Sequence, residues 1–133
     1  MTYRIAIIGA GMGGLAAAAL LAQDGHAVTL FERFPTAKPL GSGLVVQPVG
    51  LAVLDALGAG EEARSLGAPL TRMLGHSGAR IALDVAYRPG QPGLAMHRAA
   101  LFHCLWQAAP VRGSAPPPAT PPPARARPRP AST

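Results

Sequence analysis

The chain has 133 residues, of which 49% are hydrophobic, and a formal net charge of +6. Its length suits one domain, and its single cysteine, Cys104, excludes an internal disulfide and a cysteine-based metal site. Such sparse use of cysteine is typical of a protein of the reducing cytoplasm.

The first part of the chain predicts a strand, a turn, a helix and a second strand. Residues 2–8 are a short, β-branched apolar run that ends at a glycine, which is typical of a buried strand. Residues 9–14 predict a turn, and the alanine- and leucine-rich residues 15–23 predict a helix that ends before Gly25. Residues 27–31 predict a second strand, parallel to the first because the connection is too long for a hairpin.

The apolar run from Ile5 to Ala22 has a second interpretation, as a signal peptide or a membrane span. Its glycine spacing, its polar flanks and the strand that follows at once favour the strand–turn–helix instead.

The remaining pattern is less regular. Residues 33–47 contain two prolines and two glycines and predict a long loop, whereas residues 48–57 and 61–66 predict helices. Residues 70–75 and 80–85 predict an antiparallel pair that turns at Ser77-Gly78. A short strand is expected at 94–97 and a helix at 98–109. The fold class is therefore α/β: an incomplete, Rossmann-like parallel βαβ unit with a small antiparallel excursion.

Three glycines in the first turn form a nucleotide-binding pattern. Gly9, Gly11 and Gly14 form G-x-G-x-x-G after a strand and before a helix, which is the context that gives this pattern meaning. Gly9 permits a tight turn, Gly11 lets a diphosphate approach the main chain, and Gly14 lets the helix pack close to the strand. The helix N-terminus then faces the diphosphate with free N–H groups.

An acidic residue, Glu32, follows directly on the second strand. There a carboxylate can accept hydrogen bonds from the ribose hydroxyls of a dinucleotide, and it would repel the 2′-phosphate of NADP. The residues thus allow either NAD or FAD. The alternative is that the glycines only pack a helix onto a sheet and that Glu32 is a solvated charge.

The segment from Ile5 to Arg33 resembles the amino terminus of FAD-dependent oxidoreductases, and more narrowly that of the aromatic-ring hydroxylases typified by p-hydroxybenzoate hydroxylase. Residues 41–48 (GSGLVVQP), the helix end at 54–58 (LDALG) and residues 96–101 (MHRAAL) are also similar to that family. The resemblance covers Thr2 to about Ala109.

The resemblance implies FAD as the cofactor. It assigns binding roles to Gly9, Gly11, Met12, Gly13, Gly14, Glu32, Arg33 and Arg98. Arg98 would reach the ribityl and diphosphate region of the flavin, whereas Arg33 would lie along the adenine or diphosphate or be a solvated charge.

The same resemblance implies the reaction of the complete family members, which is NAD(P)H- and O₂-dependent hydroxylation of an aromatic or similar small molecule. FAD and that substrate are the expected partners, with no nucleic acid, membrane or metal, and no residue of this chain is predicted to be catalytic because the flavin carries the redox chemistry. The later motifs of the family are not found, so we expect an N-terminal, truncated FAD-binding part. Two alternatives remain: another FAD enzyme of the halogenase or isoprenoid reductase type, and a non-catalytic remnant.

The composition divides the chain into a partial FAD-binding domain, residues 1–109, and a tail, residues 110–133. The tail is rich in proline, alanine and arginine and contains four arginines but no acidic residue, which predicts disorder. A frameshifted end is favoured, since GC-rich DNA encodes these residues in a wrong frame. A genuine linker and a nucleic-acid-binding tail are the alternatives.

Overall fold

The computed structural model describes residues 1–33 and 42–109, so the predicted tail lies outside the described residues. The strands are β1 (Arg4–Ile8), β2 (Ala27–Phe31), β3 (Gly43–Val46), β4 (Ala68–Leu70), β5 (Arg72–Ser77), β6 (Arg80–Ala86) and β7 (Gly93–His97). The helices are α1 (Met12–Gln23), α2 (Pro48–Ala56), α3 (Gly60–Ser65) and α4 (Arg98–Ala108).

The first unit is the predicted parallel βαβ. β1 and β2 pair in parallel, from Arg4 opposite Ala27 to Ile8 opposite Phe31, and α1 connects them. α1 ends where expected, since Gly25 has a φ of +84°. The helix begins earlier than expected, at Met12, so the prediction that residues 9–14 are all turn is wrong for the last three of them. The chain completes its reversal within the residues that precede Met12.

The second unit is a three-stranded antiparallel sheet in the order β3-β7-β4. β3 corrects the prediction of a loop over residues 33–47, because residues 43–46 pair with β7 and Val46 is buried. The other part of that predicted loop, residues 34–41, lies outside the described residues. The strand expected near residues 94–97 is confirmed as β7, and it is the central strand of this sheet.

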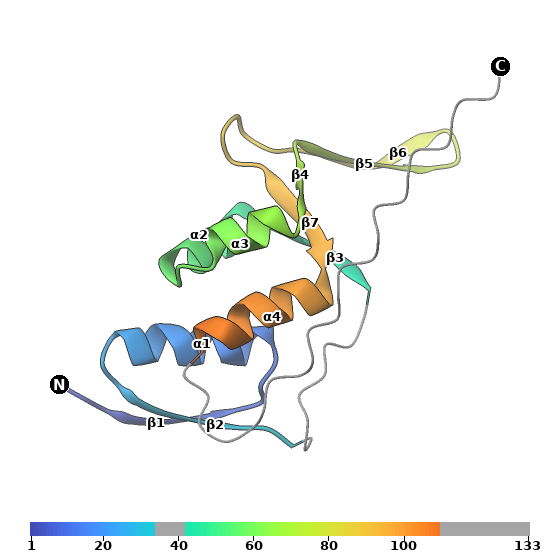
Figure 1. The fold of residues 1–133 in the computed structure, drawn as a ribbon. Helices are drawn as coiled ribbons and strands as arrows, with labels where there is room; N and C mark the ends of the chain where they lie inside the picture. Colours follow the sequence, from blue (N-terminus) through green and yellow to red (C-terminus); the bar gives the residue numbers. More distant parts are fainter. Residues whose placement is uncertain (34–41, 110–133) are drawn as a thin grey trace.

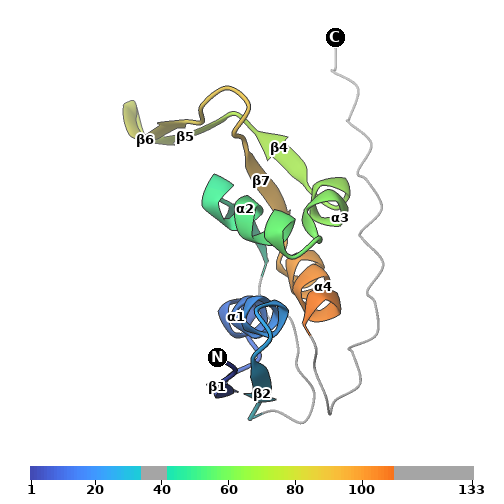
Figure 2. The same cartoon turned by 90° about the vertical axis from the view of Figure 1, so that its left-hand side faces the viewer.

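The predicted antiparallel pair is confirmed as the hairpin of β5 and β6, which projects from the body of the molecule (Figures 1 and 2). Its strands begin at Arg72 and Arg80, so Leu70 belongs instead to β4, paired with β7. Arg72 donates to Asp84 across the hairpin at 2.7 Å. This ion pair is exposed and adds little to stability.

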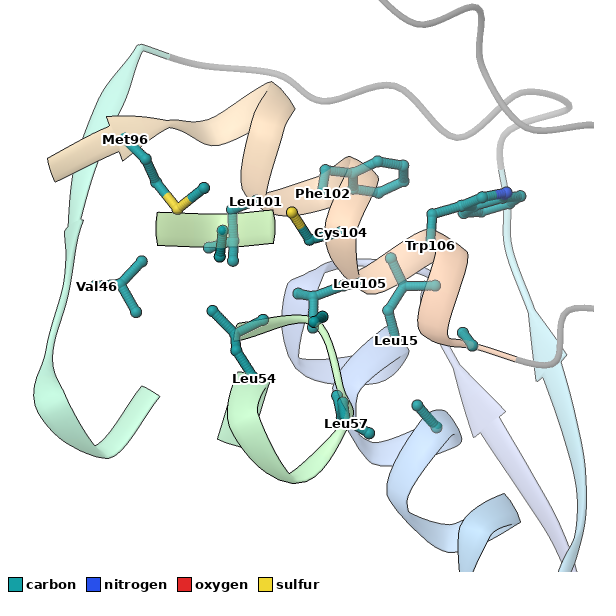
Figure 3. Close-up of a cluster of buried hydrophobic side chains, with 14 of the residues drawn as sticks. Leu15, Val46, Leu54, Leu57, Met96, Leu101, Phe102, Cys104, Leu105 and Trp106 are labelled. Carbon is teal, nitrogen blue, oxygen red and sulfur yellow. The ribbon is translucent and has the colours of Figure 1, made fainter. Parts of the chain in front are cut away.

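The hydrophobic core lies between the two units and joins them. α1 and α4 lie side by side (Figures 1 and 2), and Figure 3 shows Leu15 of α1 among side chains of α4 and of the segment around α2. Leu15, Leu54 and Cys104 are the largest fully buried side chains. On α4, Phe102, Leu105 and Trp106 are buried.

The apolar run from Ile5 to Ala22 is divided among β1, the glycine turn and α1. Within residues 1–33 and 42–109, no helix combines the length and the hydropathy needed to cross a bilayer. The sheet of β1 and β2 is covered by α1 on one face only: on the other face Ile8 is 90% exposed and Phe31 55% exposed. The α/β class with an incomplete parallel sheet is thus confirmed.

The core makes a quantitative prediction at Leu54, which is 1% exposed. Replacing Leu54 with alanine leaves a cavity in the core, so we expect Leu54→Ala to lower the free energy of unfolding by about 2–5 kcal/mol. Val49→Ala, at a position of α2 that is 76% exposed, is the matched control and should change it by less than about 0.5 kcal/mol. Urea denaturation followed by circular dichroism measures both values, and equal losses would contradict this assignment of the core.

The buried thiol of Cys104 makes a prediction about pH. Burial, and secondarily the negative charge of Glu62, raise the pKa of Cys104 to about 11 from the ordinary 9.0. Between these pH values the unfolded chain releases the thiol proton and the folded chain keeps it, so stability falls as pH rises. Urea denaturation at pH 8 to 11 should therefore show that the free energy of unfolding falls more steeply with pH in the wild type than in Cys104→Ala. Identical slopes would refute the raised pKa.

Candidate functional site

The site is built on the turn between β1 and α1. Gly9 has a φ of +100°, a conformation that favours glycine, and its N–H donates to the carbonyl oxygen of Phe31 at 2.7 Å. The turn is therefore attached to the end of β2 as well as to β1. This attachment fixes the direction in which α1 leaves the sheet.

Gly14 sets the distance between α1 and the turn. A Cβ atom at Gly14 would overlap the carbonyl oxygen of Gly9, and it would lie 3.2 Å from the carbonyl carbon of the same residue and 3.5 Å from Cγ2 of Ile7. Any side chain here would push the helix away from β1. The role predicted for Gly14, close packing of helix and strand, agrees with this geometry.

Gly11 and Gly13 differ from Gly14 because nothing in the described structure crowds them. A Cβ atom at either position would meet no atom within 4 Å. Gly11 is the N-cap residue of α1 and has an extended conformation, with φ −77° and ψ 178°. The space beside Gly11 is thus open to a molecule that approaches the main chain.

The N-terminus of α1 offers hydrogen-bond donors to such a molecule. The first N–H groups of a helix have no partner within the helix, and here no side chain of the described residues caps them. The first turn also contains no acidic residue. Met12 and Gly13, the first residues of α1, therefore present main-chain N–H groups and the positive end of the helix dipole, a combination that suits an anion.

Glu32 lies at this turn. Its Oε2 accepts a hydrogen bond from the main-chain N–H of Ala10 at 2.7 Å. Ile8 is opposite Phe31 in the parallel register, so the residue after each strand is brought to the same end of the sheet. The position of Glu32 directly after the second strand predicted that it lies near the turn, but its bond to Ala10 was not predicted. The parallel pairing predicts only that the two residues lie at the same end of the sheet, and the bond itself depends on the exact register of β1 and β2.

Two arginines, Arg98 and Arg33, were predicted to bind the cofactor. Arg98 is the first residue of α4, and its N–H donates to the carbonyl oxygen of Ser42 at 3.3 Å. Figure 1 shows α4 and α1 beginning on the side of the molecule where β1 and β2 end, which brings the start of α4 to the side of the glycine turn. Arg33 follows Glu32 directly and is exposed.

Two ion pairs whose members have shifted pKa values lie outside this turn. Arg64 holds the pKa of Asp55 below its ordinary value through a bidentate hydrogen bond, and Arg72 does the same for Asp84. Both pairs are on the surface. No group of histidine, cysteine and acidic side chains within residues 1–33 and 42–109 could hold a metal ion. The turn itself presents main-chain donors and one carboxylate.

Comparison with known proteins identifies the family to which this sequence is similar. Residues 2–116 match the family described as FAD binding domain. The chain is 37% identical over 113 residues to 3-hydroxybenzoate 6-hydroxylase 1 of Aquipseudomonas alcaligenes, covering 79% of this chain and 28% of that protein. It therefore spans little more than a quarter of that relative.

Solved structures with a similar fold are also found. The chain superposes on a tetrameric form of 2-methyl-3-hydroxypyridine-5-carboxylic acid oxygenase with a TM-score of 0.70 and 27% identity, over 80% of this chain and 29% of that one. It also superposes on HpxO of Klebsiella pneumoniae in complex with FAD and uric acid, with a TM-score of 0.59 and 27% identity, over 80% of this chain and 28% of that one.

The contrast between Gly13 and Gly14 can be tested directly. Gly14→Ala places a methyl group against the Gly9 carbonyl, so α1 must move and we expect a loss of about 1–3 kcal/mol in unfolding free energy. Gly13→Ala adds the same group in open space and should be neutral or stabilising by up to about 1 kcal/mol, because alanine favours helix. Denaturant titration distinguishes the two; equal effects would mean that the close contact at Gly14 does not exist.

Proposed function

The chain belongs to the FAD binding domain family, and on that premise we propose that it binds the ADP half of FAD at the glycine turn, as the N-terminal part of an FAD-dependent monooxygenase. FAD is the cofactor of this family. The activity, substrate and partners of a complete protein enter only as proposals, because the chain spans little more than a quarter of its relatives.

One arrangement carries the proposal. The diphosphate would approach Gly11, where the main chain is open and the first N–H groups of α1 are available. Glu32, held at the same turn, would accept hydrogen bonds from the adjoining ribose. The residues of the turn therefore fit the ADP half of a dinucleotide, and membership of the family distinguishes FAD from NAD.

The roles of individual residues follow from their positions. We assign the diphosphate to the main chain of Gly11, Met12, Gly13 and Gly14, and the ribose to Glu32. Gly9, whose N–H is bonded to Phe31, would shape the turn that receives the diphosphate. Arg98 would approach the cofactor from the start of α4, which begins on the side of the turn. Arg33 would meet the adenosine half from the end of β2.

When bound, FAD supplies the redox chemistry by which NAD(P)H and O₂ hydroxylate a substrate, and the protein orients the cofactor. We propose a small aromatic molecule as the substrate. The support is the series of relatives at the sequence level, which includes a 3-hydroxybenzoate 6-hydroxylase and a 3-amino-4-hydroxybenzoate 2-monooxygenase of Streptomyces cremeus. We also propose a cytoplasmic location, supported by a single, buried cysteine.

Gly11 separates binding from folding and so provides the test. Gly11→Val puts a branched side chain where the diphosphate would lie, yet the extended conformation of residue 11 accepts valine, and its Cβ meets no atom of the described residues within 4 Å. We expect the affinity for ADP and for FAD to fall by about tenfold or more, as expected when charge-assisted hydrogen bonds are lost. Isothermal titration calorimetry measures both affinities.

Ala52→Val is the control for Gly11→Val, because it adds similar bulk at an exposed position of α2. It should leave both affinities unchanged, and the thermal unfolding of both variants should resemble that of the wild type. Unchanged binding of ADP by a folded Gly11→Val protein would rule out the glycine turn as the diphosphate site.

A further inference from the structure

The glycine turn is attached to the end of β2 by two hydrogen bonds from consecutive residues. The N–H of Gly9 donates to the main-chain oxygen of Phe31 at 2.7 Å, and the N–H of Ala10 donates to Oε2 of Glu32 at 2.7 Å. The first bond joins main chain to main chain and needs no particular side chain. The second exists only because residue 32 has an acceptor that reaches back to the turn.

The bond between Ala10 and Glu32 fixes the part of the turn that follows Gly9. Ala10 is buried, with 4% of its surface exposed, and Gly9 before it has a positive φ. An N–H group in such a place that lost its partner would have to be rehydrated or remain unpaired, either of which favours another shape of the turn. A bond to an ionised carboxylate is about twice as strong as one between neutral groups.

We propose that Glu32 is a positioning residue for the diphosphate, in addition to its contact with the sugar. Its carboxylate holds the N–H of Ala10 and thereby keeps the turn in its binding shape before any nucleotide arrives. This inference rests on the proposed function, since it assumes that the turn receives the diphosphate. The bond itself is a property of the chain alone.

The two roles of Glu32 predict opposite results with a ligand that has no sugar. If Glu32 served only the ribose, removing its negative charge would leave the binding of inorganic pyrophosphate unchanged or make it tighter, because like charges repel. If Glu32 holds the turn, its removal weakens pyrophosphate binding in spite of the charge. Pyrophosphate is therefore the probe that separates the roles.

The first measurement concerns the free protein. Amide hydrogen exchange by NMR should show that the protection of the Ala10 N–H falls about tenfold or more in Glu32→Ala, as expected for loss of a bond to a charged acceptor. Glu32→Gln retains a neutral acceptor, so the protection of the Ala10 N–H should fall less in this variant. Glu61→Ala removes the same charge from an exposed position of α3 and should leave the protection of Ala10 unchanged.

The second measurement is binding of pyrophosphate and of ADP, followed by NMR titration of the amides of α1. Pyrophosphate should bind about threefold or more weakly to Glu32→Ala than to the wild type and to Glu61→Ala, with Glu32→Gln in between. The affinity for ADP should fall further than that for pyrophosphate, because the contact with the ribose of ADP is lost as well.

The outcomes are distinguishable. Protection of Ala10 within twofold of the wild type in Glu32→Ala would overturn the positioning role, whatever the ligands do. Lost protection with unchanged or tighter pyrophosphate binding would overturn its link to the diphosphate. A wild-type protein that binds neither ligand would contradict the proposed function, whereas the exchange measurement would still decide whether Glu32 holds the turn.

Discussion

The close approach of α1 to β1 is the constraint on which the structure depends. It is made possible at Gly14, where even a methyl group would overlap the carbonyl oxygen of Gly9. Because the helix starts so close to the strand, Leu15, the next residue, is buried completely. The same start directs the first N–H groups of the helix to the end of the sheet. The packing of the core and the geometry of the proposed site are thus two results of one contact.

The two units of the fold contribute unequally to the site. The βαβ unit contains the turn and Glu32, and the second unit contains Arg98, which is proposed to approach the cofactor from the start of α4. The packing of α4 along α1 brings these parts to one side, and the buried residues of α4 fix that packing. Since α4 follows directly on β7, the central strand of the second sheet determines where Arg98 lies.

Local patterns in the sequence predicted the βαβ unit, the hairpin and the helix α4, because each depends on residues near one another in the chain. The strand at residues 43–46 was missed, since its partner is β7, some fifty residues later. The start at residue 68 of β4 was missed for the same reason, and Pro69 obscured it. At the site the glycines could be predicted from their spacing. The bond from Ala10 to Glu32 could not, because it depends on the exact register of β1 and β2.

α1 belongs both to the glycine turn and to the core shared by the two units. A ligand that binds only the folded turn therefore acts on the folding equilibrium of the whole described chain. By mass action, a free ligand at a hundred times its dissociation constant stabilises the folded state by about 2.7 kcal/mol. For a small domain of marginal stability this is a large share of the total. Cellular cofactor supply would consequently govern how much of this polypeptide escapes proteolysis.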